Sequence, residues 1–251
     1  MNRFRRSLTS VVALATTATI AVALAAPPAS ARTGGVGGLW LLDEGSGQVA
    51  NDLSYNGNRG MLGTTAGVDA NDPTWVSLPK LLLLKRAALR FSGAQSVRMP
   101  DAPSLEPDGV TVLARVRSTG AGAFRYVMSK GAFQCENASY GLFTDADGGL
   151  VFYVSDGTDV YRSADAGAGL WDGEWHTVMG AFDGTSIRLY VDGRQIGTPV
   201  PAAVSVYYGM PTGDDFYVGD YGGPCASPLG FVGDIDAAAV LGRYDRTATL
   251  G

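Results

Sequence analysis

Apolar and polar residues alternate in the stretch from residue 173 to residue 197, and two Asp-Gly pairs interrupt the alternation. Between these pairs, Ile187, Leu189 and Val191 share one set of positions and Arg188 and Tyr190 share the other. This two-residue period is typical of a strand with one buried and one solvated face. Asp-Gly favours tight hairpin turns because both residues tolerate positive φ. The stretch therefore predicts a three-stranded antiparallel meander.

The same period recurs in short runs along the rest of the chain. It is clearest in residues 110–117, where Val110, Val112, Ala114 and Val116 share one face. Other β-prone runs are residues 39–42, 87–91, 97–99, 126–130, 139–144, 150–155, 160–163, 216–219 and 231–241. Turn residues separate about a dozen such runs, and no amphipathic helical pattern stands out. This order predicts an all-β sandwich or barrel.

Two stretches do not follow a clear period. Residues 69–79 show no regular alternation, and Leu81-Leu82-Leu83-Leu84 fits either a buried strand or a short helix. Periodicity cannot decide between these alternatives for so short an apolar run.

The first 31 residues have the features of a secretory signal peptide. Three arginines precede an Ala-rich apolar run, and Ala29-Ser30-Ala31 supplies a small-x-small cleavage pattern before Arg32. A membrane anchor is the alternative, but Ala and Thr dominate the run and Pro27-Pro28 end it early. We therefore expect a secreted mature chain of residues 32–251 that forms one domain and does not insert into a membrane.

The net charge of the mature chain limits the classes of binding partner that it favours. The full chain has 19 basic and 24 acidic residues, and three of the basic ones lie in the leader, so the mature net charge is near −8. An acidic chain disfavours nucleic acid and anionic lipid as partners. Neutral glycans and cations remain compatible with this charge.

Two cysteines, Cys135 and Cys225, are the whole cysteine complement. In an exported protein the simplest expectation for such a pair is a disulfide. Two free thiols are the alternative.

Several motifs together resemble one known family. They are Trp175-His176-x-Val178, Phe182-Asp183-Gly184, Leu189-Tyr190-Val191-Asp192-Gly193, Trp40-x-x-Asp43-Glu44-Gly45, Asp52-x-Ser54-x-Asn56-Gly57-Asn58, Ala88-Leu89-Arg90-Phe91 and Phe231-x-Gly233-x-Ile235-Asp236. In this order they resemble the laminin G-like members of the concanavalin A-like lectin/glucanase superfamily.

The resemblance implies an antiparallel jelly-roll sandwich of two curved sheets. It also implies a lectin, an adhesion module or the carbohydrate-binding partner of a secreted enzyme, with calcium in some members. The chain departs from the family pattern after Asp236, where Ala237-Ala238-Ala239 follow instead of an acidic residue.

A glycoside hydrolase of this fold needs two carboxylates that flank the scissile bond. The chain has four glutamates, and none lies in the Glu-x-Asp-x-x-Glu pattern of the related retaining glucanases. Asp234 and Asp236 alternate on one strand, would face the same way and form a candidate acid–base pair. We expect no catalytic residues, and a secreted hydrolase that uses these two aspartates is the alternative.

Calcium prefers hard oxygen ligands from loops. Asp52 and Asn56 lie in a loop rich in such groups, and Asp236 on the last strand is expected to reach the same ion. The alternative is a hydrogen-bonded Asx turn without metal.

Aromatic side chains near loops offer flat faces to sugar rings. Tyr208 and Tyr221, together with Asp214 and Asp215, which they flank, are the four expected ligand-binding residues. His176, the only histidine, is expected to be structural. We expect a carbohydrate-binding module without catalysis. A protein-binding adhesion module is the remaining alternative.

Overall fold

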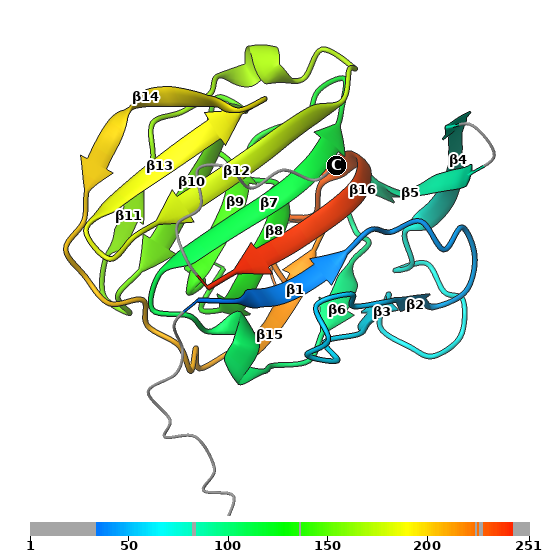
Figure 1. Cartoon of the computed structure of the whole chain (residues 1–251), viewed down its shortest axis with the longest axis horizontal. Coiled ribbons are helices and arrows are strands. Elements are labelled where there is room, and N and C mark those ends of the chain that lie inside the picture. Colours follow the sequence, from blue (N-terminus) through cyan, green and yellow to red (C-terminus); the bar gives the residue numbers. More distant parts are fainter. Residues whose placement is uncertain (1–33, 82–83, 136, 224, 226–227, 243–251) are drawn as a thin grey trace, which may run out of the picture.

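The computed structural model describes residues 34–81, 84–135, 137–223, 225 and 228–242. In it, 16 strands form two antiparallel sheets that face each other (Figure 1). This arrangement confirms the all-β antiparallel sandwich. The predicted signal peptide, residues 1–31, lies outside the described residues.

Sheet A has eight strands and occupies the front of Figure 1. In spatial order it contains β14 (Arg194–Pro201), β13 (Ser186–Val191), β12 (His176–Phe182), β7 (Val110–Arg117), β16 (Val232–Leu241), β5 (Leu84–Ser92) and β4 (Thr74–Leu81), and β1 (Val36–Trp40) also pairs with β16.

Sheet B has eight strands and lies behind sheet A. Its order is β11 (Val160–Arg162), β10 (Leu150–Ser155), β9 (Tyr140–Thr144), β8 (Tyr126–Ala132), β15 (Gly213–Val218), β6 (Val97–Met99), β3 (Gly60–Leu62) and β2 (Val49–Ala50). Two 3₁₀ turns, η1 (Pro103–Leu105) and η2 (Ala168–Leu170), are the helical elements of the described residues. Across these residues, no helix has the length and apolarity needed to span a membrane.

The meander predicted from the alternation is β12, β13 and β14, in antiparallel pairing. Asp192 and Gly193 connect β13 to β14 with φ values of 49° and 74°, as a two-residue type I′ hairpin requires. Ile187 and Leu189 are fully buried, and Val191 is half-buried. Tyr190, predicted on the solvated face, is only 7% exposed because it packs against Leu113 and Met179 on the outer side of sheet A.

The core lies between the two sheets and follows the predicted alternation in β7. Val110, Val112, Ala114 and Val116 all have 0% exposure. Each fully buried side chain of this size contributes roughly 1.5–3 kcal/mol of hydrophobic stabilisation, apart from the smaller alanine. Trp40 of β1 stacks on Phe216 of β15 with ring centroids 5.4 Å apart, so an aromatic pair joins the two sheets.

The strand β4 was not predicted, and the structure explains why. It lies at the edge of sheet A, and its pairing with β5 shifts register between Leu78 and Leu81, next to Pro79. An edge strand with a bulge tolerates proline and disturbs the two-residue period. Leu81 and Leu84, at the two ends of the apolar run that fitted either a strand or a helix, pair with each other as residues of β4 and β5. Leu82 and Leu83 lie outside the described residues.

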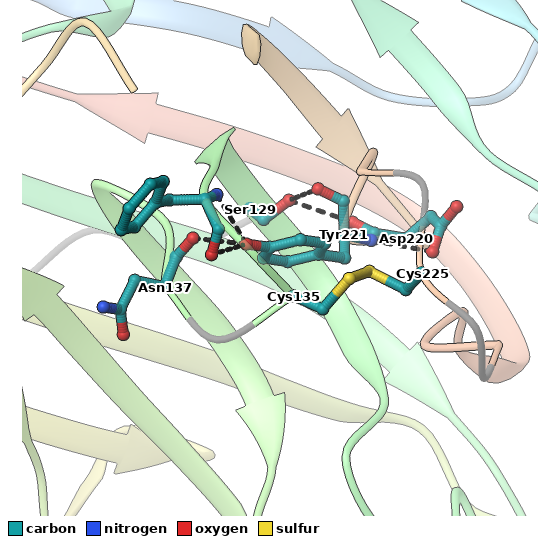
Figure 2. Close-up of a disulfide and its surroundings, with 7 residues drawn as sticks. Ser129, Cys135, Asn137, Asp220, Tyr221 and Cys225 are labelled. Carbon is teal, nitrogen blue, oxygen red and sulfur yellow. Dashed lines mark hydrogen bonds between the residues drawn. A yellow bond between two sulfur atoms is a disulfide. The ribbon is translucent and has the colours of Figure 1, made fainter. Parts of the chain in front are cut away.

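The predicted disulfide between Cys135 and Cys225 is confirmed, with a Cα–Cα distance of 5.7 Å. It fastens the segment after β8 to the segment that follows β15. Figure 2 shows the ring of Tyr221 beside the disulfide, with its hydroxyl directed at the backbone of Asn137. The same hydroxyl also lies within hydrogen-bond distance of the Phe133 N–H and carbonyl.

Replacing both cysteines in a Cys135→Ala/Cys225→Ala variant is expected to lower the free energy of unfolding by about 4 kcal/mol, because the closed loop spans 90 residues. Guanidinium chloride unfolding at equilibrium measures this change. Wild-type protein reduced with dithiothreitol is the matched control and should unfold at the same midpoint as the variant. An unchanged midpoint in both samples would contradict the prediction.

Candidate functional site

A pocket of about 300 Å³ opens at one end of the sandwich. Three loops form it: residues 119–123 between β7 and β8, residues 146–148 between β9 and β10, and the η2 segment with Ala168 and Trp171. Its volume is at the lower end of the range for ligand pockets, which suits a small ligand such as a sugar ring.

Hydrogen bonds between the loops hold the pocket walls. The Trp171 indole N–H donates to the Gly148 carbonyl at 2.7 Å, and the Thr144 hydroxyl donates to the Gly122 carbonyl at 2.5 Å. Trp171 is 7% exposed and packs on Phe231 with ring centroids 5.7 Å apart. The pocket walls are therefore held by hydrogen bonds between the loops and by packing of Trp171 on the hydrophobic core.

The chemistry of the pocket is that of small side chains and backbone groups. Glycine and alanine supply most of the lining, and Asp147 is the single ionisable side chain among the lining residues. Such a surface offers backbone donors and acceptors and one carboxylate acceptor to a polyhydroxylated ligand.

A second polar cluster surrounds Lys130 of β8, whose side chain has 0% exposure. Its ammonium lies 2.8 Å from Asp101, 3.2 Å from Glu106 and 3.5 Å from Asp214. The carboxylate oxygens of these three residues lie within 4.8 Å of one another, an arrangement that would suit a metal ion. Here the lysine ammonium supplies the compensating charge.

Two of the four predicted ligand residues, Tyr208 and Asp214, contact this lysine, and Asp215 is linked to it through Asp101. The Tyr208 ring centroid lies 5.7 Å from the Lys130 ammonium, and its hydroxyl donates to the Pro107 carbonyl at 2.7 Å. Asp214 pairs with Lys130, and Asp215 pairs with Arg98 and accepts the Asp101 N–H at 2.8 Å. Tyr208, Asp214 and Asp215 are each partly exposed.

Tyr221 does not join this group. It is 1% exposed, packs against Tyr126 with ring centroids 5.0 Å apart, and accepts the Phe133 N–H at 2.7 Å (Figure 2). Its face is therefore covered by the disulfide segment and by sheet B, and it is not presented to solvent. The position of Tyr221 beside Asp214 and Asp215 in the sequence gave no sign of this burial.

The predicted calcium ligands form two separate hydrogen-bonded groups. One Asp52 oxygen accepts the backbone N–H groups of Leu39 and Ser54, and the other accepts the Ser54 hydroxyl and the Asn58 N–H, at 2.8–3.1 Å. Burial raises the pKa of Asp52, but these hydrogen bonds outweigh it and lower the pKa.

The Asn56 amide donates to the Val36 and Gly37 carbonyls, at 2.7 and 3.0 Å, whereas Asp236 binds Arg86 and Arg115. These hydrogen bonds match the Asx-turn alternative. They do not fit a calcium ion shared by Asp52, Asn56 and Asp236, because the side chains already bind separate protein groups.

Asp234 and Asp236 lie on β16 and are each clamped by two arginines from the neighbouring strands. Asp234 receives a two-point contact from Arg90, at 2.7 and 3.0 Å, and one from Arg117 at 2.6 Å. Burial opposes ionisation of both aspartates. The arginine hydrogen bonds outweigh burial for Asp234 and lower its pKa, whereas burial prevails for Asp236 and raises its pKa.

His176 lies between two aspartates at the start of β12. Its Nδ1 is 2.7 Å from Asp192 and its Nε2 is 3.1 Å from Asp172. Burial lowers the pKa of His176, but the hydrogen bonds to Asp192 and Asp172 together outweigh burial and raise the pKa. This placement agrees with the structural role expected from the sequence.

Sequence reasoning missed both the pocket and Lys130. A charged residue inside the apolar run of β8 was a visible signal for a buried ion-pair cluster. The pocket left a weaker signal, a loop of glycine and alanine at residues 120–123 whose partners in space come from two other loops.

The two facing antiparallel sheets define a jelly-roll sandwich. A laminin G-type family model, described as the concanavalin A-like lectin/glucanases superfamily, matches residues 91–248. This match covers more than half of the chain, and the chain belongs to that superfamily. The family resemblance drawn from the motifs is thereby confirmed. No curated protein matches the chain in sequence.

Solved structures share the fold at low identity. Domain 4 of AbnA, a GH43 extracellular arabinanase from Geobacillus stearothermophilus in complex with arabinotriose, has a TM-score of 0.57 at 14% identity, over 83% of this chain and 93% of that chain. The Ruminococcus gnavus IT-sialidase CBM40 bound to alpha2,3 sialyllactose has a TM-score of 0.52 at 16% identity, over 63% and 92%. A Trypanosoma rangeli sialidase has a TM-score of 0.53 at 15% identity, over 83% and 31%.

Titration of His176 by proton NMR is expected to give a pKa above 6.5, and an Asp192→Asn variant should lower it. The stabilisation from the charged histidine is then fully present below about pH 6.5 and is lost as the pH rises through the folded-state pKa. The chain has a single histidine, so one ring resonance reports the titration. An Asp43→Asn variant is the control, and a wild-type pKa at or below 6.5 would contradict the prediction.

EDTA is expected to leave the melting temperature unchanged, because the Asp52 oxygens already accept four hydrogen bonds from the protein. Differential scanning calorimetry measures the melting temperature, first with about 5 mM EDTA and then with excess calcium. The calcium is added at roughly millimolar concentration, because weak extracellular calcium sites fill in that range. A fall in EDTA that calcium restores would instead support a structural calcium ion.

Proposed function

We propose that this chain is a secreted glycan-binding module that acts without catalysis. Membership of the concanavalin A-like lectin/glucanases superfamily carries the proposal. The structural neighbours support it, because they include an arabinanase domain in complex with arabinotriose and a CBM40 module bound to alpha2,3 sialyllactose.

The pocket formed by residues 119–123, 146–148, Ala168 and Trp171 is the proposed primary sugar site. Its hydrogen-bonded walls favour binding, since a preorganised site loses little conformational entropy when a ligand enters. The rim with Tyr208, Asp214 and Asp215 is a proposed further contact for a longer glycan, because these side chains are partly exposed. Lys130 holds Tyr208 and Asp214 in place, and Arg98 holds Asp215. Tyr221 is assigned a structural role beside the disulfide.

Binding without catalysis is supported by the state of the two candidate carboxylates. Asp234 and Asp236 are 4% and 6% exposed, and arginines contact both. A secreted glycoside hydrolase is the second candidate function, favoured by the position of the two aspartates two residues apart on β16. The opposite directions of their pKa shifts agree with an acid–base pair.

Secretion is supported by the leader-like residues 1–31 and by the disulfide, since disulfides persist in oxidising compartments. The acidic composition supports a partner other than nucleic acid. A protein-binding adhesion module would use the same fold, and it would differ in giving no response to free oligosaccharides.

A glycan array followed by calorimetric titration is expected to identify at least one oligosaccharide that binds wild-type protein. An Ala146→Trp variant should weaken this binding about tenfold or more, because the new ring closes an exposed edge of the pocket. Ala66→Trp, at an exposed loop position away from the pocket, is the matched control and should bind like wild type. Absence of any array signal would contradict the proposal, and reducing-sugar release abolished by Asp236→Asn would favour the hydrolase.

A further inference from the structure

Four arginines form a cluster on the outer face of sheet A, the face turned away from sheet B. Arg115 and Arg117 come from β7, and Arg86 and Arg90 come from β5; the strand between them is β16 (Figure 1). We call these four residues the arginine ladder. Asp234 is paired in register with both Arg90 and Arg117, so each side of β16 carries arginine.

The ladder has more positive than negative charge. Its four guanidinium groups surround two carboxylates, which leaves a net charge of +2 on a chain whose formal charge is −5. Two aspartates would be neutralised by two arginines, so the ion pairs alone do not require four. The excess charge is available to a ligand.

The arginines are accessible while the aspartates below them are not. The side chains of Arg86, Arg90, Arg115 and Arg117 are 38%, 56%, 26% and 33% exposed, whereas both aspartate side chains are 5% exposed. Each guanidinium carries five N–H donors. Arg90 uses its Nε and one Nη on Asp234, and its other Nη remains outside that contact.

Half-buried Trp175 borders the ladder on the β12 side. The guanidinium carbons of Arg115 and Arg117 lie 4.7 and 4.8 Å from its ring centroid. An aromatic ring next to arginines offers an apolar surface to a sugar ring beside donors for a charged substituent.

Asp236 adds an independent observation. It is 6% exposed, and its Oδ1 has no hydrogen-bond partner among the described residues, although its Oδ2 binds Arg86 and Arg115. A buried carboxylate oxygen without a donor is costly, so Asp236 is incompletely compensated and its two arginines are not matched to it alone.

We propose that the arginine ladder and Trp175 form a second binding surface, which takes the carboxylate groups of an acidic, uronate-bearing polysaccharide. Each β5–β7 arginine pair meets at one aspartate oxygen, at Asp234 for one pair and at Asp236 for the other. The two pairs follow each other along β16 with a rise of roughly 7 Å, so they are placed for two carboxylates of one polymer rather than for one small anion. Planar guanidinium groups hydrogen-bond carboxylates at two points, which a lysine ammonium cannot do. This surface goes beyond the proposed function, because it lies on a sheet face and uses none of the pocket residues.

The test is calorimetric titration of the full-length mature protein with polygalacturonate at low salt. An Arg86→Gln/Arg90→Gln variant removes the two most exposed arginines and leaves each aspartate with its arginine from β7. Its affinity should fall about tenfold or more, since two charge-assisted contacts are lost. An Arg59→Gln/Arg194→Gln variant removes the same charge at exposed positions outside the ladder and should bind like wild type.

The polymer itself provides the second control. Fully methyl-esterified polygalacturonate has the same backbone without free carboxylates and should not bind. Equal affinity for the ester, equal affinity for polyglutamate, or wild-type affinity in the folded Arg86→Gln/Arg90→Gln variant would each overturn the proposal. If that variant fails to fold, Arg86→Lys/Arg90→Lys keeps the charge and should still bind several-fold more weakly than wild type.

The experiments can reject the pocket as a glycan site and the arginine ladder as a uronate site independently of each other. Ala146→Trp should leave polygalacturonate binding unchanged, because the pocket lies at the end of the sandwich. A silent array of neutral glycans together with polygalacturonate binding would reject the pocket and support the ladder. The reverse result would reject the ladder alone.

Discussion

The pairing of β16 with three other strands is the constraint on which the rest of sheet A depends. β16 pairs with β5 and β7 along its two edges and with β1 near its end, so it joins the beginning, the middle and the end of the described chain. Its inward residues Ile235, Ala238 and Val240 are fully buried in the core. The same register sets Asp234 directly between Arg90 and Arg117, so one strand determines both the closure of the sandwich and the charge pattern of its outer face.

Buried charge in this protein is compensated locally and unequally. Lys130 has no exposure and three carboxylates around it, whereas Asp234 and Asp236 are buried between arginines. Taking such groups out of water costs several kcal/mol for each ion, and close partners offset that cost. Asp234 and Asp236 show the limit of this compensation, because a two-point arginine contact lowers the pKa of one, and a carboxylate oxygen without a partner accompanies the raised pKa of the other.

The strands could be predicted where the local pattern of apolar and polar residues determines their bounds. The bounds of β7 and β10 match the predicted runs. The inward residues of β7 alternate regularly and are all buried, whereas β10 is a short run that is buried on both faces and ends at turn residues. The edge strand β4 could not be predicted, since its bulge at Pro79 breaks the period. The disulfide could be predicted because an exported chain with two cysteines usually pairs them. The burial of Tyr221 could not be predicted, because its position near acidic residues in the sequence does not show which residues cover its ring in the fold. Loop pockets are harder still, since three separate segments must meet before any one residue becomes a lining residue.

Identities of 14–16% to solved structures show that this sandwich tolerates nearly complete replacement of its side chains. A two-sheet core requires apolar residues of suitable volume on the inward positions, and many sequences satisfy that requirement. The loops and the outward positions are not constrained in this way, and they contain the features by which this chain can recognise a ligand. Gly148 illustrates the difference: it has a φ of 80°, and its carbonyl accepts the Trp171 indole N–H, so a core-braced tryptophan sets the shape of a pocket wall. The ligand must therefore be inferred from loop and surface residues of this chain, and the shared fold alone does not identify it.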